Sequence, residues 1–296
     1  MLARLIELLA AALWNLGRII PEKAALKLSR FAGFLTRGGR REAVLSRLNQ
    51  VMGSADGAGG AKFWRDHLNH VGRNVVEPIY FFHLSDSDLL GRVDIQGEEH
   101  LRGALEGGKG AILFLNHLGN PGAIVAGLGL RGYDVTIAGN AIDINFNGRI
   151  VPLNYVEGLV QRMFARGHVR RALLGAGLPQ QFSQALARNG LFAMFIDFPV
   201  VGKHNEWLPF GRSRMKVNLG PAVLALRHQV PVLNVTCIRT NGNSHLLTIH
   251  PPLTVPASGR DAAQRLLADA LGDFFPVLEK HPEQWWSWDW AQIAAV

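Results

Sequence analysis

The chain has little cysteine and no long uninterrupted apolar run. Its 296 residues include a single cysteine, Cys237. One cysteine excludes an internal disulfide and is consistent with a reducing compartment. Cys237 lies in an apolar segment, so we expect a buried core residue and not a nucleophile. Arg4, Glu7 and Arg18 interrupt the apolar N-terminus, which therefore falls short of the roughly 20 apolar residues that a membrane span needs.

Several motifs of catalysis and ligand binding are also missing. The sequence contains no G-x-S-x-G, no H-E-x-x-H and no Cys/His set with zinc spacing. We therefore expect no metal, and no cofactor other than a co-substrate. The G-x-G-x-x-G match at residues 127–132 leads into a predicted strand instead of following one, so it predicts a helix end and a turn. Nucleic-acid-binding patterns are missing too, and nucleic acid is not an expected partner.

Basic residues are in excess over acidic ones. The formal net charge is +8, which favours an anionic membrane or an acidic protein as partner. Near the N-terminus, leucines recur at helical spacing and predict an amphipathic helix: Leu2, Leu5, Leu9, Leu13 and Leu16. Such a helix, with Arg and Lys around it, suits either the surface of an anionic membrane or packing on the rest of the protein. We expect residues 1–50 to dock on a membrane.

The pattern of apolar residues changes near residue 86. Residues 1–86 indicate helices joined by glycine-rich turns, whereas residues 87–296 alternate short apolar runs with helical segments. Strands are predicted at 93–95, 111–115, 135–138, 191–196, 230–238 and 246–249. Helices are predicted at 62–83, 98–106, 121–130, 146–166, 180–189, 219–228 and 262–280. This alternation predicts an α/β fold with a mostly parallel sheet flanked by helices, preceded by an N-terminal helical membrane-docking segment.

The most informative segment is the apolar run 111–115 with the residues after it. His117 follows the predicted strand, and Asn120 and Pro121 have the pattern of an N-cap and a first helical residue. Ligands bind at the carboxyl ends of strands in open α/β sheets, and histidine is suited to proton transfer near neutral pH. We therefore predict that His117 is the catalytic base and that Asn120 is a substrate-binding residue or simply the N-cap.

Other polar residues have less specific signals. Asp197 follows the predicted strand 191–196, so its carboxylate is either catalytic or a loop cap. Arg212 and Arg214 follow a Pro-Phe-Gly turn, and their guanidinium groups are suited to clamping an anionic substrate group. Four tryptophans near the C-terminus predict an interfacial belt or a packed core: Trp285, Trp286, Trp288 and Trp290.

Several segments, taken in order, carry a family resemblance. They are Leu13–Pro21, Arg41–Asn49, Val71–Glu77, Val93–Leu101, Gly110–Asn120, Phe195–Phe198, Leu208–Gly211, Pro231–Leu233 and His281–Trp286. In this order they resemble the bacterial lipid A late acyltransferases (the lauroyl and myristoyl transferases) of the wider lysophospholipid acyltransferase superfamily. The resemblance implies transfer of a fatty acyl group from acyl carrier protein or coenzyme A to an amphiphilic acceptor. It also implies a peripheral protein on the cytoplasmic face of the inner membrane.

The resemblance also assigns roles to residues. It implies that His117 is the base and that backbone N–H groups at 118–121 or a nearby arginine stabilise the oxyanion. It also suggests that Arg166 binds substrate phosphate, although the local match is loose and a solvated helix face is the favoured interpretation of Arg166. The family pattern is His, four residues, then Asp or Glu, but this chain has Gly122 at the last position. Three explanations stay open. The acid comes from elsewhere, with Asp197 and Asp143 as candidates; the acceptor is a specialised one, such as an amine, that needs less help; or the chain is a non-catalytic homologue that binds an acyl chain or carrier protein.

Overall fold

The protein is described from a computed structural model. The described residues are 11, 15, 19–53, 58–140, 143–146, 149–152, 154–175, 177–197, 204–240, 242–255 and 260–296. The predicted N-terminal amphipathic helix lies almost entirely outside these residues. Within the part of the chain that is described, no helix combines the length and the apolar character that crossing a membrane requires.

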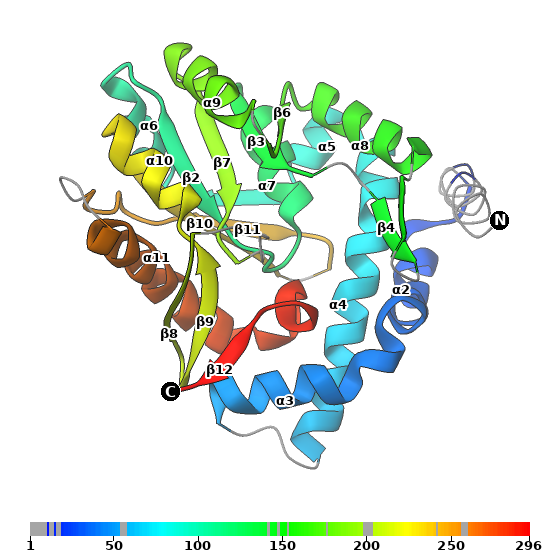
Figure 1. Ribbon diagram of the computed structural model, residues 1–296. Coiled ribbons are helices and arrows are strands. Elements are labelled where there is room, and N and C mark those ends of the chain that lie inside the picture. The colour runs from blue at the N-terminus through cyan, green and yellow to red at the C-terminus, as the bar shows by residue number, and fades with distance from the viewer. Residues whose placement is uncertain are drawn as a thin grey trace.

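A seven-stranded sheet forms the centre of the molecule (Figure 1). In spatial order its strands are β1 (Val93–Gln96), β11 (His245–Ile249), β10 (Val232–Arg239), β2 (Ala111–Leu115), β7 (Leu191–Phe195), β3 (Val135–Gly139) and β6 (Arg170–Leu173). Only β10 and β11 pair antiparallel within this sheet. The predicted α/β architecture with a mostly parallel sheet is confirmed.

Helices cover both faces of this sheet. One face packs on α5 (Asp86–Leu90), α6 (Glu98–Glu106), α7 (Pro121–Gly129) and α8 (Asn154–Arg166), the other on α9 (Leu178–Ala187), α10 (Gly220–His228) and α11 (Arg260–Lys280). Alternate residues of β2 enter different hydrophobic clusters, Ile112 and Phe114 on one face and Leu113 and Leu115 on the other. Because both faces are buried, the strand is a continuous apolar run in the sequence.

In the described part of the chain, α5 and the sheet are preceded by α2 (Glu22–Arg37), a short 3-10 turn η1 (Gly38–Arg40), α3 (Arg41–Met52) and α4 (Ala58–His83). The long helix α4 lies between α2 and the sheet (Figure 1). The backbones of α2 and α4 touch, since a Cβ atom on Gly72 would lie 1.6 Å from the carbonyl oxygen of Ser29. Val44 and Val51 of α3 share a hydrophobic cluster with residues of the sheet. The domain division at residue 86 stays a prediction.

The structure differs from the sequence reading between residues 143 and 152. The prediction that a helix starts at Phe146 is wrong. Instead, β4 (Asp143–Phe146) and β5 (Arg149–Pro152) pair antiparallel, with Phe146 opposite Arg149. The intervening Asn147-Gly148 is a preferred hairpin sequence, and Pro152 disfavours helical geometry at the residue before it. The helix α8 begins only at Asn154.

A second, smaller sheet was also not predicted. It consists of β12 (Ile293–Ala295), β9 (Ser213–Asn218) and β8 (Asn205–Phe210). The C-terminal chain enters it after two 3-10 turns, η2 (Pro282–Gln284) and η3 (Trp286–Asp289). These turns bring the C-terminal tryptophans to the carboxyl edge of the central sheet, where Leu118 forms a β-bridge with Trp285.

Candidate active site

The carboxyl ends of β2 and β7 bring His117 and Asp197 together. These strands are parallel neighbours with Leu115 opposite Phe195, so the residues two positions further along each strand lie at the same edge of the sheet. The Nδ1 atom of His117 is 2.8 Å from Oδ1 of Asp197. A buried carboxylate therefore contacts the imidazole although position 122 has no acid.

Asp197 is held as an ionised carboxylate. Its Oδ2 atom accepts hydrogen bonds from the His117 backbone N–H (2.8 Å), Trp285 Nε1 (2.7 Å) and Ser287 Oγ (2.9 Å). Burial alone would raise the pKa of Asp197, but the His117 charge and the hydrogen bonds from His117 and Trp285 outweigh it and lower the pKa. Since an ionised carboxylate only accepts, Nδ1 of His117 carries a proton, and when the ring is neutral its lone pair therefore lies on Nε2.

The His117 ring lies among aromatic side chains and reaches the surface. Its side chain is 14% exposed. The ring stacks on Phe195 with 4.0 Å between centroids and meets the rings of Trp286 and Trp290 edge-on. Trp286 and Trp290 are only partly buried, whereas Trp285 and Trp288 are in the core. The tryptophan cluster therefore has a packed half and a half beside His117.

The loop after His117 is tightly packed against the end of β10. Gly119 has φ +64, and a Cβ atom there would lie 2.5 Å from the carbonyl oxygen of Cys237, so the position requires glycine. The N–H groups of Leu118 and Gly119 donate to Asn116 Oδ1 and to the Gln284 carbonyl oxygen, which means that these two candidate oxyanion donors are already used within the protein. Cys237 is buried as expected, and burial raises the pKa of its thiol to about 12.

Two of the predicted substrate-binding residues have internal partners. Asn120 is buried, its Oδ1 accepts from Gly122 N at 2.9 Å, and its Nδ2 donates to Glu77 at 2.8 Å; its role as N-cap is confirmed. Arg166 donates to the carbonyl oxygens of Phe81 and Leu84 and to Asp86. Its guanidinium group thus satisfies the C-terminal end of α4, and this explains its position without a substrate.

The two other arginines lie on the hairpin of the smaller sheet. Arg212 is at the turn between β8 and β9, and its backbone N–H donates to Val51 at the end of α3. Arg214 is exposed on β9, and its guanidinium donates to the Trp207 carbonyl oxygen at 3.0 Å. Their described contacts are with α3 and β8, and the structure does not bring them to His117 or Asp197.

Some residues at the site had no signal of their own in the sequence. Ser287 and Arg239 are far from His117 in the chain, and only folding brings them near. Asp143, the other candidate acid, lies on β4 in the separate hairpin. Among the described residues, no group of three His, Cys, Asp or Glu side chains is arranged to hold a metal ion.

The family model for bacterial lipid A biosynthesis acyltransferases matches residues 1–288. The chain belongs to this family. Membership assigns it to the acyltransferases that act on lipid-like substrates, and it agrees with the resemblance carried by the sequence segments. No curated protein matches the chain at a significant level.

Proposed function

We propose that this chain transfers a fatty acyl group from a thioester to an amphiphilic acceptor, with His117 as general base and Asp197 as the carboxylate that orients it. The observation that carries the proposal is the 2.8 Å contact between His117 Nδ1 and Asp197 Oδ1. Asp197 supplies the carboxylate that position 122 lacks. The donor is acyl carrier protein or coenzyme A, whose acidic or phosphorylated surfaces suit a chain with net charge +8.

The geometry suits a base-assisted attack on the thioester. Nε2 of His117 takes the proton from the acceptor hydroxyl or amine while the acceptor oxygen or nitrogen bonds to the thioester carbon. The buried carboxylate of Asp197 stabilises the imidazolium that forms. When the tetrahedral intermediate collapses, the carbon–sulfur bond breaks and the leaving sulfur takes the proton from Nε2. The products are the acylated acceptor and the free thiol, and His117 returns to its starting tautomer.

Replacing the base tests the proposal. We expect His117→Ala to lose turnover of both acyl-coenzyme A and acyl carrier protein by about 10²–10⁴-fold, measured as thiol release in the presence of a bacterial lipid extract. His100→Ala, on α6 away from the carboxyl edge, is the matched control. Unchanged turnover in His117→Ala would reject the base. If the wild-type chain binds thioesters but turns neither over, the alternative of a non-catalytic acyl-chain or carrier-protein binder is correct.

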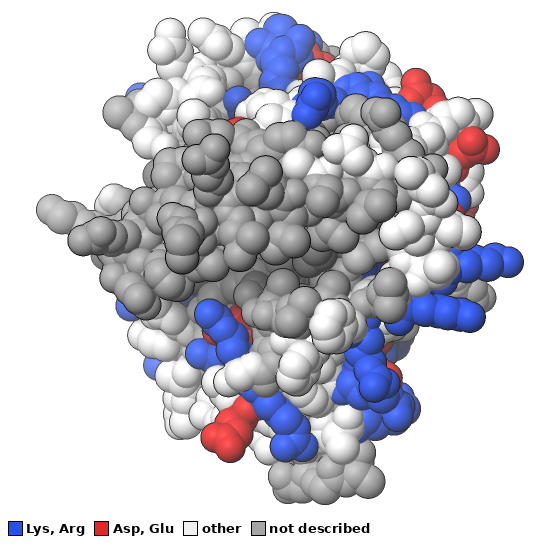
Figure 2. Space-filling view, turned by 90° about the vertical axis from the view of Figure 1, so that its right-hand side faces the viewer, with Lys and Arg blue, Asp and Glu red and all other residues white. Residues whose placement is uncertain are grey.

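We also propose that α2 contributes to docking on the cytoplasmic leaflet of the inner membrane. Its exposed basic and aromatic residues include Lys23, Lys27, Arg30, Phe31 and Phe34 among those the structure describes. The Phe31 and Phe34 side chains are 62% and 57% exposed, and they line an open groove of about 840 Å³ between α2 and α4. Figure 2 shows this side of the molecule, where the described surface carries groups of Lys and Arg side chains and fewer acidic ones. Cationic and aromatic side chains together favour an anionic interface.

Vesicle flotation tests this docking. The double variant Lys27→Glu/Arg30→Glu should bind vesicles containing phosphatidylglycerol more weakly, because each basic residue near the surface contributes about 1 kcal/mol. High salt should weaken binding of the wild type in the same way. Arg102→Glu, on α6, is the control. If the wild type fails to float at any salt concentration, the docking proposal is wrong.

A further inference from the structure

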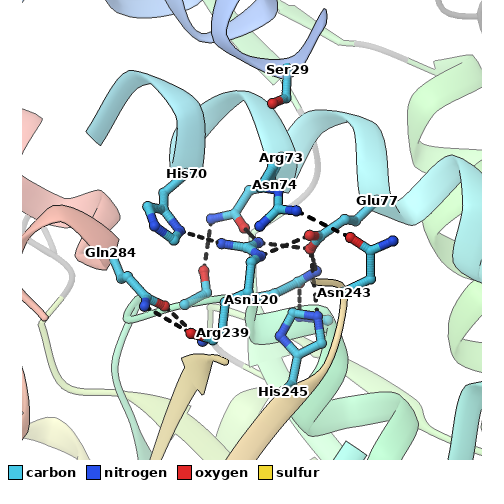
Figure 3. Close-up of polar contacts among 12 residues, drawn as sticks. Ser29, His70, Arg73, Asn74, Glu77, Asn120, Arg239, Asn243, His245 and Gln284 are labelled. Carbon is cyan, nitrogen blue, oxygen red and sulfur yellow. Dashed lines mark hydrogen bonds and ion pairs between the residues drawn. The ribbon is translucent and has the colours of Figure 1, made fainter. Parts of the chain in front are cut away.

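A buried ion pair lies beneath the loop that carries His117. Arg239, the last residue of β10, donates from Nε and Nη2 to the two carboxylate oxygens of Glu77 on α4, each at 2.7 Å. The side chains of the pair are 0% and 1% exposed. Nη2 also donates to Asn74 Oδ1 at 2.8 Å, one turn earlier on α4. The pair therefore fixes the end of β10 to one face of α4, as Figure 3 shows.

Both partners of this pair are charged, and the histidines beside them are neutral. Burial would raise the pKa of Glu77, but Arg239 and the hydrogen bonds of the site lower it. Burial and Arg239 lower the pKa of His70 to about 2, so its Nδ1 accepts from Arg239 Nη1 at 2.6 Å. Burial lowers the pKa of His245 to about 4. One buried positive charge thus faces one buried negative charge.

Two hydrogen bonds connect α4 and the ion pair with the loop after His117. Asn120 Nδ2 donates to Glu77 Oε2 at 2.8 Å, and Asn74 Nδ2 donates to the Gly119 carbonyl oxygen at 2.8 Å. In Figure 3, Asn74 and Glu77 point from α4 toward Arg239 and Asn120. The ion pair and Asn74 therefore hold Gly119 and Asn120, the second and third residues after His117, from the α4 side.

The C-terminal segment holds the same loop from the other side. Gln284 pairs with the Arg239 backbone through Oε1 (2.7 Å) and Nε2 (3.0 Å), and its carbonyl oxygen accepts from Gly119 N. The next residues contact the catalytic pair itself, since Trp286 N donates to the His117 carbonyl oxygen and Trp285 Nε1 to Asp197. Arg239 thus links α4, the loop and the C-terminal segment.

We propose that Arg239 is a positioning residue for acyl transfer: paired with Glu77, it fixes residues 117–120 so that the His117 ring stays in hydrogen-bond contact with Asp197. The inference rests on the proposed function of His117. A buried ion pair loses much of its attraction to desolvation, and an apolar pair often stabilises a fold equally well. Its fixed geometry, which an apolar pair lacks, is what a loop carrying a catalytic base requires.

Two variants of different severity test the role of Arg239. Arg239→Lys keeps the charge but loses the two-pronged contact. Asn120→Ser removes the hydrogen bond to Glu77 and keeps a hydroxyl acceptor for the N-cap. If Arg239→Lys does not fold, the milder Asn120→Ser variant still tests the proposal. Arg92→Lys is the matched control, because Arg92 also contacts both carboxylate oxygens of a glutamate, Glu22, without contacting the His117 loop.

Two measurements separate positioning from a merely structural role. In folded Arg239→Lys or Asn120→Ser we expect kcat to fall about 10²-fold with little change in KM, the effect of a misplacement of about 1 Å. We also expect loss of the far-downfield proton NMR signal of the His117–Asp197 hydrogen bond, which Arg92→Lys should retain. An unchanged signal and unchanged kcat in folded variants would overturn the proposal.

The two readouts also separate this inference from the proposed function. The NMR signal reports the contact of His117 with Asp197 whether or not His117 acts as a base. If His117→Ala keeps full turnover, the base is wrong, and the signal in Asn120→Ser still decides whether the Arg239 network positions the ring. If His117→Ala is inactive but Arg239→Lys is folded, active and retains the signal, only the positioning role is wrong.

Discussion

Replacing Asp197 with asparagine should reverse the proton positions on the His117 ring without removing any hydrogen-bond partner. Oδ2 of Asp197 accepts from three donors, so the single amide oxygen of asparagine must take that place. The amide NH₂ group then faces His117 Nδ1 and donates to it. The ring proton consequently moves to Nε2, where the base needs its lone pair.

The expected loss can be estimated from the serine proteases. There the same change at the carboxylate that orients the catalytic histidine lowers kcat about 10⁴-fold. This corresponds to about 5.4 kcal/mol of transition-state stabilisation. KM for the thioester should change little, because the described contacts of Asp197 are all within the protein. The fold should persist, since the asparagine can satisfy the same neighbours.

Steady-state kinetics with an acyl thioester and ¹⁵N NMR of the His117 ring measure the two effects. The NMR shifts should change from the Nδ1–H to the Nε2–H tautomer in Asp197→Asn. Asp143→Asn, at the other candidate acid, should keep wild-type kcat and tautomer. The reasoning is refuted if Asp197→Asn keeps more than about a tenth of kcat, or if Asp143→Asn loses as much as Asp197→Asn.

Three further predictions follow from buried contacts. Ser287→Ala removes one donor from the Asp197 carboxylate and should lower the free energy of unfolding at pH 7 by about 1.5–3 kcal/mol. Because folding lowers the pKa of Asp197, this contribution is present above the pKa of the unfolded state and is lost as the pH falls through the pKa of the folded state. Equal losses of stability at pH 7 and in acid would contradict this prediction. Gly72→Ala forces apart α2 and α4, since its Cβ would lie 1.6 Å from a backbone oxygen. Urea unfolding should show a loss of about 1–3 kcal/mol or more, whereas Gly103→Ala on α6, with nothing within 4 Å of its Cβ, should cost nothing or stabilise. Cys237 should react with a thiol reagent only after denaturation, because burial raises its pKa to about 12; rapid labelling of the native protein would disprove this.

Local sequence signals located most elements that flank the site. The apolar run 111–115 coincides with β2 because a strand buried on both faces has no polar side to interrupt it. Asn120 and Pro121 mark the start of α7 because an N-cap side chain and a proline satisfy the first turn locally. Short strands without such a run, β6, β8 and β9, were missed, since their burial depends on partners elsewhere.

From the amino-acid pattern alone, His117 and Asp197 each follow a buried strand, and both are candidates for proton transfer. The pattern left Asp143 as a rival and gave roles to Arg166, Arg212 and Arg214 that their described contacts do not support. The pairing of β2 with β7, and not with β3, the next strand in the sequence, is known only from the folded arrangement of the sheet. Strand order depends on how helices and strands pack across the whole sheet. No local pattern encodes it, and it is this order that places the Asp197 carboxylate against the His117 ring.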